Sequence, residues 1–427
     1  MRALVSRPPS VLLSNLRSLR WQDERESFLP LLRTLLVPTI RSMRLGSIGA
    51  YPWARYFAKS DVLDSLGTQC PSIQEFVCAY CVDSDAISEL VCGWKELLCL
   101  ETGVLNTRSL YHLTSLPSLK SLRFRPPNDF DDTQPNSTAI FTSQLDDVCI
   151  TAPVPQFFTR YLRNVRFLSC RSVVLLAGRC DLELSYYDPL MDIPDLRHES
   201  QEVRDLMVSL SQCFSPALKE ISFDFSFLYE DGCPLSLDFD AVVPLLLFSR
   251  LTKLDLDWFS TLSINDSELK NMAQSWPQLE ELSLGTATGE WPVYPPILTF
   301  VGLVHLIRYC RRLRYIAISF CAGSIDVECE SFTKTIPNEK ITHIGVGISP
   351  IVNPMVVACQ LHALLPNLSY VQTDSDTSPL PHEFQQMKDN WKKVVGFLEV
   401  LVTGARMRDR MNQARAAFCR PKELQLE

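Results

Sequence analysis

A short hydrophobic phrase recurs along the 427-residue chain. In each copy, an apolar residue is followed by two variable residues, a second apolar residue, one variable residue and a third apolar residue. This is the L-x-x-L-x-L pattern of leucine-rich repeats, and clear consecutive copies lie about 22 to 34 residues apart. The copies begin at Leu16, Ile40, Ile73, Leu97, Leu119, Leu145, Leu218, Leu251, Leu279, Leu313, Ile341 and Leu368. The recurrence predicts one repeat architecture over most of the chain.

The alternation within each copy predicts a short strand whose apolar side chains all point to one face. A single copy cannot shield that face from water, so the copies must stack, with their strands side by side in a parallel sheet. The segments 61–69, 201–213, 266–276 and 299–310 lie between copies and have helical spacing. We therefore expect an α/β leucine-rich-repeat solenoid with a curved parallel sheet inside and helices outside.

Two stretches follow the pattern less closely. Residues 126–138 contain prolines and acidic residues without periodicity, which predicts an exposed loop. The copies between residues 154 and 195 are degenerate, but two sets of apolar residues predict at least one more strand there: Val165, Leu168 and Cys170, and later Val173, Val174, Leu175 and Leu176. In the segment 266–276, Asp266 precedes helically spaced apolar residues and is the expected N-cap.

The pattern changes near the C-terminus. Residues 374–381 form a turn-rich break, and from Phe384 to Phe418 the spacing is helical. The predicted apolar face of this helix consists of Trp391, Val394, Val395, Leu398, Leu401 and Val402. We predict a repeat solenoid over residues 1–380 and a C-terminal helical cap or tail over 381–427, because the last repeat needs a cover for its apolar end.

The C-terminal segment is also basic within an acidic protein. Its cationic residues are Lys388, Lys392, Lys393, Arg406, Arg408, Arg410, Arg415 and Arg420. Two interpretations stay open at this stage. The charges form a solvated helix face, or they contact an acidic partner or an acidic part of the same chain.

Composition narrows the classes of partner. Hydrophobic residues make up 46% and charged residues 21% of the chain, which is typical of a folded protein. The net charge of -8 gives no general attraction to nucleic acid or anionic membranes, and we expect neither as a partner. The 15 scattered cysteines are typical of reduced thiols, and no segment has the length and hydrophobicity of a membrane span, so we expect a cytoplasmic or nuclear protein.

Candidate catalytic and metal sites have simpler interpretations. The Cys78-Ala79-Tyr80-Cys81 segment is compatible with a zinc or redox site, but Cys78 takes the last apolar place of a repeat and Cys81 follows it at a turn position that Cys321 also occupies. Pro350 interrupts the glycine pattern that begins at Gly345. We predict no enzyme activity, metal or cofactor. An unrecognised α/β hydrolase or transferase and a zinc-binding module are the alternatives.

The variable positions of the strands should face the hollow of the solenoid, where such proteins bind their partners. They grade from basic through acidic to aromatic, and Arg and Tyr often anchor protein interfaces. The predicted partner-binding residues on this concave face are Arg20, Arg44, Arg123, Arg125, Asp224, Asp255, Asp257, Glu281, Tyr315, His343 and Tyr370. We expect a protein ligand there.

Three segments resemble a known family. Residues 13–21, 167–173 and 276–284 are similar to the repeat region of the F-box and leucine-rich-repeat proteins abundant in mushroom-forming fungi. The resemblance implies a non-catalytic protein-interaction scaffold that serves as the substrate-recognition part of a cullin-RING ubiquitin ligase. In that family an N-terminal F-box binds the ligase adaptor. No Leu-Pro-x-Glu-like opening is present here, so adaptor binding is expected only if an F-box lies upstream. The alternative is a repeat-only binding protein without a ligase role.

Overall fold

The computed structural model describes residues 13–22, 28–46, 60–78, 84–126, 138–152, 154–177, 200–225, 235–286, 295–323, 330–347, 349–373 and 382–418. The chain divides into two compact units. Unit 1 comprises Met1–Cys233 and Asp240–Leu251, and unit 2 comprises Pro234–Phe239 and Thr252–Glu427. Both units repeat one theme, in which a short parallel strand alternates with a helix.

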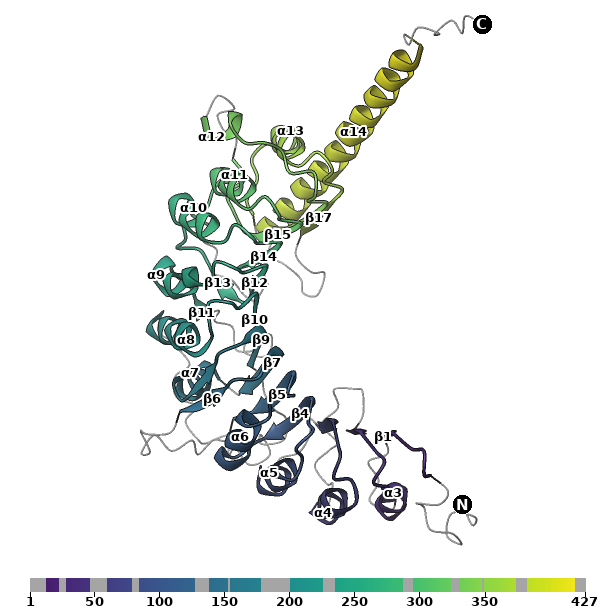
Figure 1. Cartoon of the computed structure of the whole chain (residues 1–427). Helices are drawn as coiled ribbons and strands as arrows, with labels where there is room; N and C mark the ends of the chain where they lie inside the picture. Colours follow the sequence, from purple (N-terminus) through teal and green to yellow (C-terminus); the bar gives the residue numbers. More distant parts are fainter. Residues whose placement is uncertain are drawn as a thin grey trace, which may run out of the picture. The chain divides into compact units, whose positions relative to one another are not determined.

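Unit 1 has parallel strands along one side and helices along the other (Figure 1). Its main sheet runs in the order β1 (Ser18–Trp21), β2 (Ser42–Leu45), β3 (Glu75–Cys78), β4 (Cys99–Val104), β5 (Ser121–Arg125), β7 (Leu145–Ala152), β9 (Cys170–Ala177) and β10 (Glu220–Asp224). A second, two-stranded sheet pairs β6 (Ala139–Phe141) with β8 (Val165–Phe167). The helices are α3 (Leu29–Leu35), α4 (Ser60–Gln69), α5 (Ser84–Cys92), α6 (Thr107–Thr114), α7 (Pro155–Arg163), α8 (Ser200–Cys213), α9 (Phe239–Val242) and the 3-10 helix η4 (Val243–Leu247).

Unit 2 follows the same plan. Its parallel strands run in the order β12 (Lys253–Leu256), β14 (Glu281–Leu284), β15 (Tyr315–Ile318), β16 (His343–Gly347) and β17 (Tyr370–Thr373). A separate two-stranded sheet pairs β11 (Leu235–Ser236) with β13 (Phe259–Ser260). The helices are α10 (Asp266–Ser275), α11 (Phe300–Tyr309), α12 (Glu330–Thr333), α13 (Pro354–Leu364) and α14 (His382–Phe418).

The strand register places equivalent leucines side by side. In unit 1, Leu122 pairs with Val148, and in unit 2, Leu254, Leu282 and Ile316 stand in one line across three strands. All five side chains are fully buried. Burying one such side chain contributes roughly 1.5–3 kcal/mol, so the stacked copies form the core of each unit. The predicted α/β leucine-rich-repeat solenoid is confirmed.

A recurring hydrogen bond joins consecutive copies just before each strand. The Arg17 carbonyl oxygen accepts from the backbone N–H groups of Arg41 and Ser42, at 2.7 and 3.0 Å, and the Arg41 carbonyl accepts in the same way from Gln74 and Glu75. Unit 2 repeats the arrangement at Thr252, Glu280 and Thr342. The carbonyl of one repeat thus fixes the register of the next.

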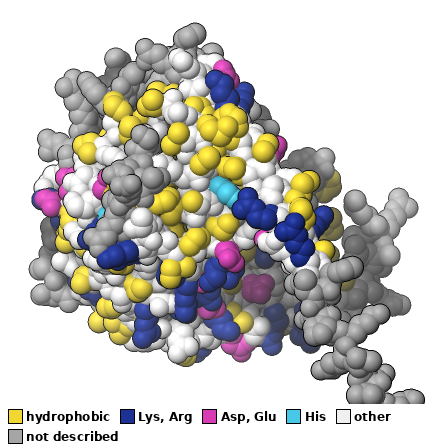
Figure 2. Space-filling model, turned by 90° about the horizontal axis from the view of Figure 1, so that it is seen from above, with side chains coloured by type: hydrophobic (Ala, Val, Ile, Leu, Met, Phe, Trp, Pro, Cys, Tyr) yellow, Lys and Arg dark blue, Asp and Glu magenta, His cyan; other side chains and the backbone are white. Residues whose placement is uncertain are grey.

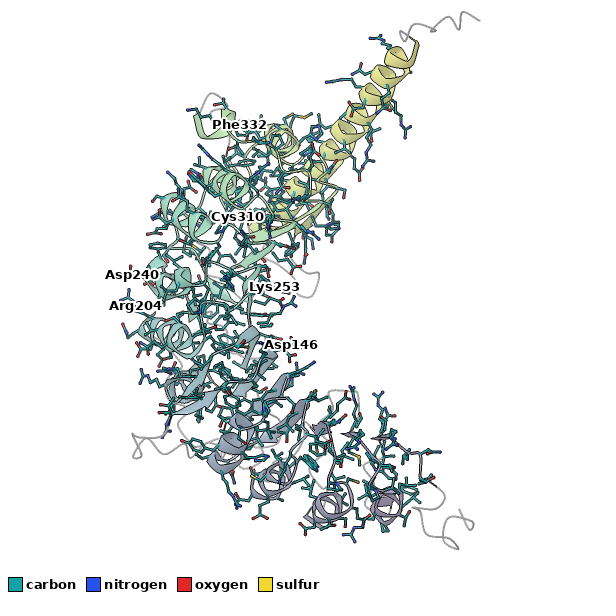
Figure 3. All side chains as sticks on the ribbon, viewed as in Figure 1. Asp146, Arg204, Asp240, Lys253, Cys310 and Phe332 are labelled. Carbon is teal, nitrogen blue, oxygen red and sulfur yellow. The ribbon has the colours of Figure 1, made fainter. Side chains whose placement is uncertain are left out.

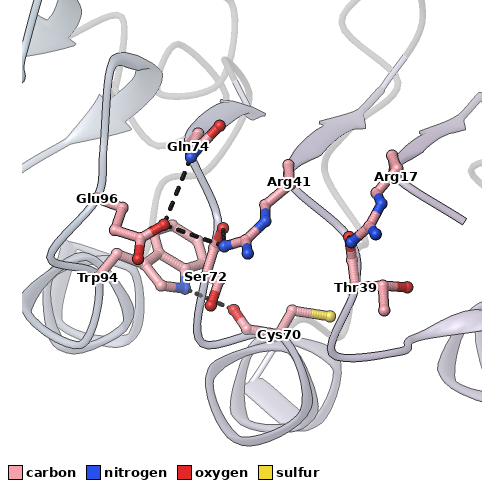
Figure 4. A network of polar contacts seen from close by, with 8 residues as sticks. All are labelled: Arg17, Thr39, Arg41, Cys70, Ser72, Gln74, Trp94 and Glu96. Atoms are coloured by element: carbon pink, nitrogen blue, oxygen red, sulfur yellow. Dashed lines mark hydrogen bonds and ion pairs between the residues drawn. The ribbon is translucent and has the colours of Figure 1, made fainter. Parts of the chain in front are cut away.

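Side chains reinforce these turns in unit 1 (Figure 4). The Arg41 guanidinium donates to the Ser72 carbonyl oxygen at 2.9 Å and to the Glu96 carboxylate at 3.0 Å, so it connects two later repeats. The Trp94 indole N–H donates to the Cys70 carbonyl oxygen at 3.0 Å, inside the unit. These polar groups have structural partners, so we assign them to the scaffold.

The degenerate region contains the further strand that was predicted, and it includes the segment from Val173 to Leu176. The strand that joins the main sheet is β9, where Cys170, Val173 and Leu175 fill the three apolar places and pair with Leu145, Val148 and Ile150. The expected phrase of Val165, Leu168 and Cys170 is wrong, because Val165 belongs to β8 of the small sheet and Leu168 is 55% exposed. Of the predicted loop at 126–138, residues 127–137 lie outside the described residues.

The N-cap of α10 is Asn265, not Asp266 as the pattern suggested. The Asn265 side chain accepts from the backbone N–H groups of Ser267 and Glu268, and the Glu268 side chain accepts from the Asn265 N–H, which completes a capping box. Asp266 is the first helical residue and bonds to the next repeat instead.

The C-terminal helix α14 packs against α13 and β17 through its first half. Trp391, Val394, Leu398 and Val402 are buried, and the Trp391 indole N–H donates to the Ser349 carbonyl oxygen at 2.7 Å. The helix therefore covers the β17 end of unit 2. The division of the chain at residue 380 stays a prediction.

Candidate protein-binding surface on the strand wall

The residues on either side of the second apolar position of each unit 2 strand form two straight rows, in which Ala317 and Gly345 are buried. Because the strands are parallel and in register, equivalent residues of neighbouring repeats lie side by side. The first, here called the charged–aromatic row, consists of Lys253, Glu281, Tyr315, His343 and Tyr370. The second, here called the small-residue row, consists of Asp255, Ser283, Ala317, Gly345 and Gln372. Together they are the strand wall of unit 2.

The middle of the small-residue row has no room for larger side chains. A Cβ atom built on Gly345 would lie 2.9 Å from the Ala317 Cβ and 3.5 Å from the Tyr315 hydroxyl oxygen. The Tyr315 side chain therefore lies over the backbone of the next strand. Glycine at this position lets an aromatic ring of the first row extend along the wall.

Acidic groups surround that tyrosine. Burial raises the pKa of the Tyr315 hydroxyl above its ordinary value of 10.0, and the charges of Asp257, Asp255 and Glu281 raise it further. Tyr315 is therefore a neutral phenol with carboxylates close to it. Lys253 lies 3.3 Å from the Glu281 carboxylate, and both groups are about half exposed. A cation from a ligand that approached this wall would meet the carboxylates of Asp255 and Glu281 and the ring of Tyr315.

Aromatic groups occupy the other end of the first row. The rings of His343 and Tyr370 have centroids 5.4 Å apart, and Tyr370 is 52% exposed. The Thr342 hydroxyl lies 2.7 Å from the His343 Nδ1 atom, within hydrogen-bonding distance. Exposed aromatic faces of this kind attract ammonium and guanidinium groups through cation–π interactions.

Asp257 has a structural role that the sequence did not indicate. It lies in the turn after β12, where its Oδ1 atom accepts from the Thr286 backbone N–H at 2.7 Å and from the Thr286 hydroxyl. The carboxylate thus joins this turn to the following repeat. Its negative charge still acts on Tyr315, but its oxygen is already occupied.

The predicted residues of unit 1 divide into two groups. Arg20 and Arg44 are paired in register and exposed. Arg123 is held by Glu101 on the neighbouring strand, at 3.3 Å. Arg125 on the same strand as Arg123 is only 8% exposed, so the expectation that it faces a ligand is wrong, and we exclude it from the proposed surface.

The remaining unit 1 residue, Asp224, is half-buried at the end of β10 opposite Leu176. On the helix side of this unit, Arg204 and Asp240 form an ion pair at 2.6 Å, whereas Asp146 lies on the strand side (Figure 3). The predicted site residues therefore lie in two units: Arg20 and Arg44 are neighbours in unit 1, and the larger group, from Asp255 to Tyr370, lies in unit 2.

Sequence reasoning missed the small-residue row apart from Asp255. Ser283, Ala317, Gly345 and Gln372 carry no chemistry that draws attention one at a time. Aligning the copies on their second and third apolar positions would have found them, because each residue lies between those two positions.

The cysteines do not gather into a site within the described residues. Cys78 is buried at the last apolar place of β3, as expected from the repeat register, and Cys81 lies outside the described residues. Among the residues that the structure describes, no three His, Cys, Asp or Glu side chains are placed to hold a metal ion. None of the described helices has both the length and the hydrophobicity required to cross a membrane.

No family model matches the sequence, and no curated protein matches it. Among solved structures, the chain is similar to the complex of Rad7 and Elc1 in yeast, with 13% identity, a TM-score of 0.39, and coverage of 83% of this chain and 82% of that one. It is also similar to the leucine-rich repeat-containing protein LegL7 from Legionella pneumophila, with 11% identity, a TM-score of 0.38, and coverage of 89% and 98%.

A third match is the TLR13–ssRNA13 complex, with 13% identity, a TM-score of 0.26, and coverage of 90% of this chain and 62% of that one. At these TM-scores the likenesses carry no argument about fold or function. The fold assignment rests on the chain's own strand register and on the buried repeat positions.

Proposed function

We propose that this protein is a non-catalytic interaction scaffold that binds a basic polypeptide segment on the strand wall of unit 2. The observation that supports this function most directly is the alignment of carboxylates and aromatic rings over the small-residue row. In repeat proteins the extended sheet surface is the usual place for a protein ligand.

The proposed ligand is a chain that presents Lys or Arg side chains. The methylene stem of such a side chain packs on the Tyr315 ring, which extends over Gly345 because that residue has no side chain. Its charged end then lies near Asp255 and Glu281. Tyr315 and Tyr370 each add a cation–π contact that is worth about 0.5–2 kcal/mol.

Fluorescence anisotropy with two labelled peptides tests this function. One peptide alternates Lys and Ala residues, and in the other Glu replaces each Lys. The full chain should bind the lysine peptide and not the glutamate peptide. Glu281→Lys and Tyr370→Ala should each weaken binding about tenfold, because each removes a contact worth roughly 1.4 kcal/mol.

Asp146→Lys is the matched control, since it makes the same charge change as a carboxylate reversal on the wall but lies on β7 of unit 1. It should leave binding of the lysine peptide unchanged. Equal losses in Glu281→Lys and Asp146→Lys would mean that total charge decides binding, and the proposed surface would be wrong. Thermal unfolding of each variant shows whether it is folded.

We propose in addition that the bound polypeptide is a substrate for ubiquitination, with this chain as the substrate-recognition part of a cullin-RING ligase. Support comes from the resemblance of residues 13–21, 167–173 and 276–284 to F-box and leucine-rich-repeat proteins. Co-expression with a ligase adaptor, followed by affinity purification of this protein, tests the assignment. Retention of the adaptor is expected from a longer chain that carries an upstream F-box, and failure of such a chain to retain it would indicate a repeat-only binding protein.

A further inference from the structure

The second half of α14 is a helix without a described partner for its apolar side. From Thr403 to Arg415 every described side chain is exposed except Ala405, which is partly exposed. In Figure 1 this end of α14, drawn in yellow, extends beyond α13. The large apolar residues Val400, Met407 and Met411 are 70%, 60% and 58% exposed.

These apolar residues follow a heptad spacing. Val400, Gly404, Met407, Met411 and Ala414 are separated by steps of four, three, four and three residues, which places them in one line along a helix. We call this line the α14 seam. Gly404 leaves a gap in it, since a Cβ atom built there would meet no atom within 4 Å.

The seam lies on the side of α14 opposite to the face that covers unit 2. At 3.6 residues per turn, Val400 is roughly half a turn away from Leu398 and Val402, and both of these are buried. The seam therefore takes no part in packing against unit 2, although Val400 lies between the buried residues Leu398 and Val402 in the sequence. An apolar line on a solvated helix is typical of a site for a second helix.

Arginines flank the seam on both sides. With Met407 as position d and Met411 as position a of a heptad, Arg408 and Arg415 take e positions and Arg410 takes a g position. All three are exposed. Side chains at e and g pair with the partner helix, so like charges there disfavour two copies of α14 side by side and favour a partner with acidic e and g positions.

We propose that the α14 seam binds an acidic amphipathic helix of another protein, with the partner's apolar residues packed against Met407 and Met411 and its carboxylates against the flanking arginines. Methionine suits this role because its flexible, polarisable side chain adapts to different apolar surfaces. This site is separate from the strand wall of unit 2, so either site can fail its test independently of the other.

A membrane surface fits the seam less well than a helix. The apolar line is one residue wide and carries no aromatic residue among its described members, whereas helices that lie in membrane interfaces have a broad apolar face rich in Trp, Phe and Leu. Exposed hydrophobic and basic side chains nevertheless lie next to each other on this part of α14. Figure 2 shows Lys and Arg side chains beside hydrophobic ones on the face of the molecule seen from above. Lipid binding is therefore one outcome of the test.

The experiment uses the full chain and a fluorescein-labelled helical peptide with Leu at its a and d positions and Glu at its e and g positions. A matched peptide carries Lys in place of each Glu. Anisotropy titration should give saturable binding of the glutamate peptide and about tenfold weaker binding of the lysine peptide. Met411→Gln and Arg408→Glu should each weaken binding of the glutamate peptide about tenfold.

Two control variants lie on the same helix. Asn412→Gln introduces the same side chain as Met411→Gln one position outside the seam, and Arg406→Glu makes the same charge change as Arg408→Glu at position c, which faces away from a partner helix. Both should bind like the unaltered chain. Equal effects of seam and control variants, or equal binding of the two peptides, would overturn the proposal.

Two further measurements decide between occupants. In sedimentation, Met411→Gln should have the same oligomeric state as the unaltered chain. Vesicles containing phosphatidylserine should likewise show no binding that depends on the seam. Seam-dependent dimers or seam-dependent vesicle binding would each replace the helical partner with a second copy or a lipid surface.

Discussion

Two buried thiols connect consecutive repeats. The Cys310 sulfur lies 3.4 Å from the Ala273 carbonyl oxygen and 3.5 Å from that of Trp276, at the end of the preceding helix. The Cys70 sulfur donates in the same way to the Val37 carbonyl oxygen at 3.4 Å. Burial raises the pKa of Cys310 from 9.0 to about 12 and that of Cys70 to about 11. These thiols are structural donors that stay protonated at neutral pH.

The raised pKa of Cys310 predicts a loss of stability at alkaline pH. Because the folded chain holds this proton more tightly than the unfolded chain, the stabilisation is complete below pH 9 and is lost as the pH rises towards 12. At pH 10 the free energy of unfolding should have fallen by about 1.4 kcal/mol from this thiol alone. Urea unfolding of the unaltered chain and of Cys310→Ala between pH 7 and 10 measures the difference.

Cys310→Ala should show a correspondingly flatter decline with pH, whatever its stability at pH 7. Cys359→Ala is the control, because Cys359 is exposed and its removal should leave the decline unchanged. Parallel pH profiles for the unaltered chain and Cys310→Ala would contradict the assignment.

At the scale of the elements, the joint between α10 and α11 shows how one residue fixes two helices. The Asp266 carboxylate accepts from the Thr299 backbone N–H at 2.8 Å, from the Thr299 hydroxyl at 2.6 Å and from the Gly302 N–H at 3.0 Å. A Cβ atom on Gly302 would lie 2.7 Å from the same carboxylate oxygen. The first turn of α10 therefore caps the first turn of α11.

Asp266→Ala should lower the free energy of unfolding by about 2–3 kcal/mol, because two backbone N–H groups at the start of α11 lose a charged acceptor. Asn271→Ala is the control, since Asn271 is exposed on the same helix and should cost less than about 0.5 kcal/mol. Equal midpoints of the two variants in urea would show that the carboxylate does not hold the joint.

The elements themselves were largely predictable, because each strand is marked by three apolar positions that stacking requires. The segment 201–213 was expected to be helical, and α8 spans Ser200–Cys213. The strand at β9 was expected from Val173 to Leu176, but its register was not, because Cys170 takes the place of the first leucine. The cap of α10 was misassigned by one residue, since Asn265 and Asp266 are both good caps and only the backbone geometry separates them.

The candidate surface was less predictable than the fold. The alternation of apolar and variable positions predicts which side chains point away from the core. Whether such a side chain can contact a ligand depends on its neighbours in other repeats. Arg125 is buried although its position alternates correctly, and Asp257 is occupied by Thr286 from the next repeat. Gly345 contributes by lacking a side chain, which no search for reactive groups detects.

At the scale of the whole molecule, stability is close to a sum of repeats and of the interfaces between neighbours. A stack of this kind is weakest where the last repeat has no neighbour. In unit 2 the neighbour of β17 is α14, and its largest anchor is Trp391, which is 1% exposed. The Trp391 ring lies 6.2 Å from that of Phe320, centroid to centroid, in an edge-on arrangement. The contact joins the helix to the interior of the stack.

Trp391→Ala should therefore loosen unit 2 from its C-terminal end inwards. Removing a buried tryptophan costs about 3–5 kcal/mol, and here it also leaves the Ser349 carbonyl oxygen without its donor. Because each repeat mainly contacts its neighbours, the loss should be local. Hydrogen exchange should accelerate most in β17 and β16, less in β12, and not at all in β2 to β5 of unit 1. The control is Lys392→Ala, which changes an exposed residue next to Trp391 and should leave exchange in all of these strands unchanged. Uniform acceleration across both units would mean that the chain unfolds as one cooperative block, and the nearest-neighbour account of its stability would have to be abandoned.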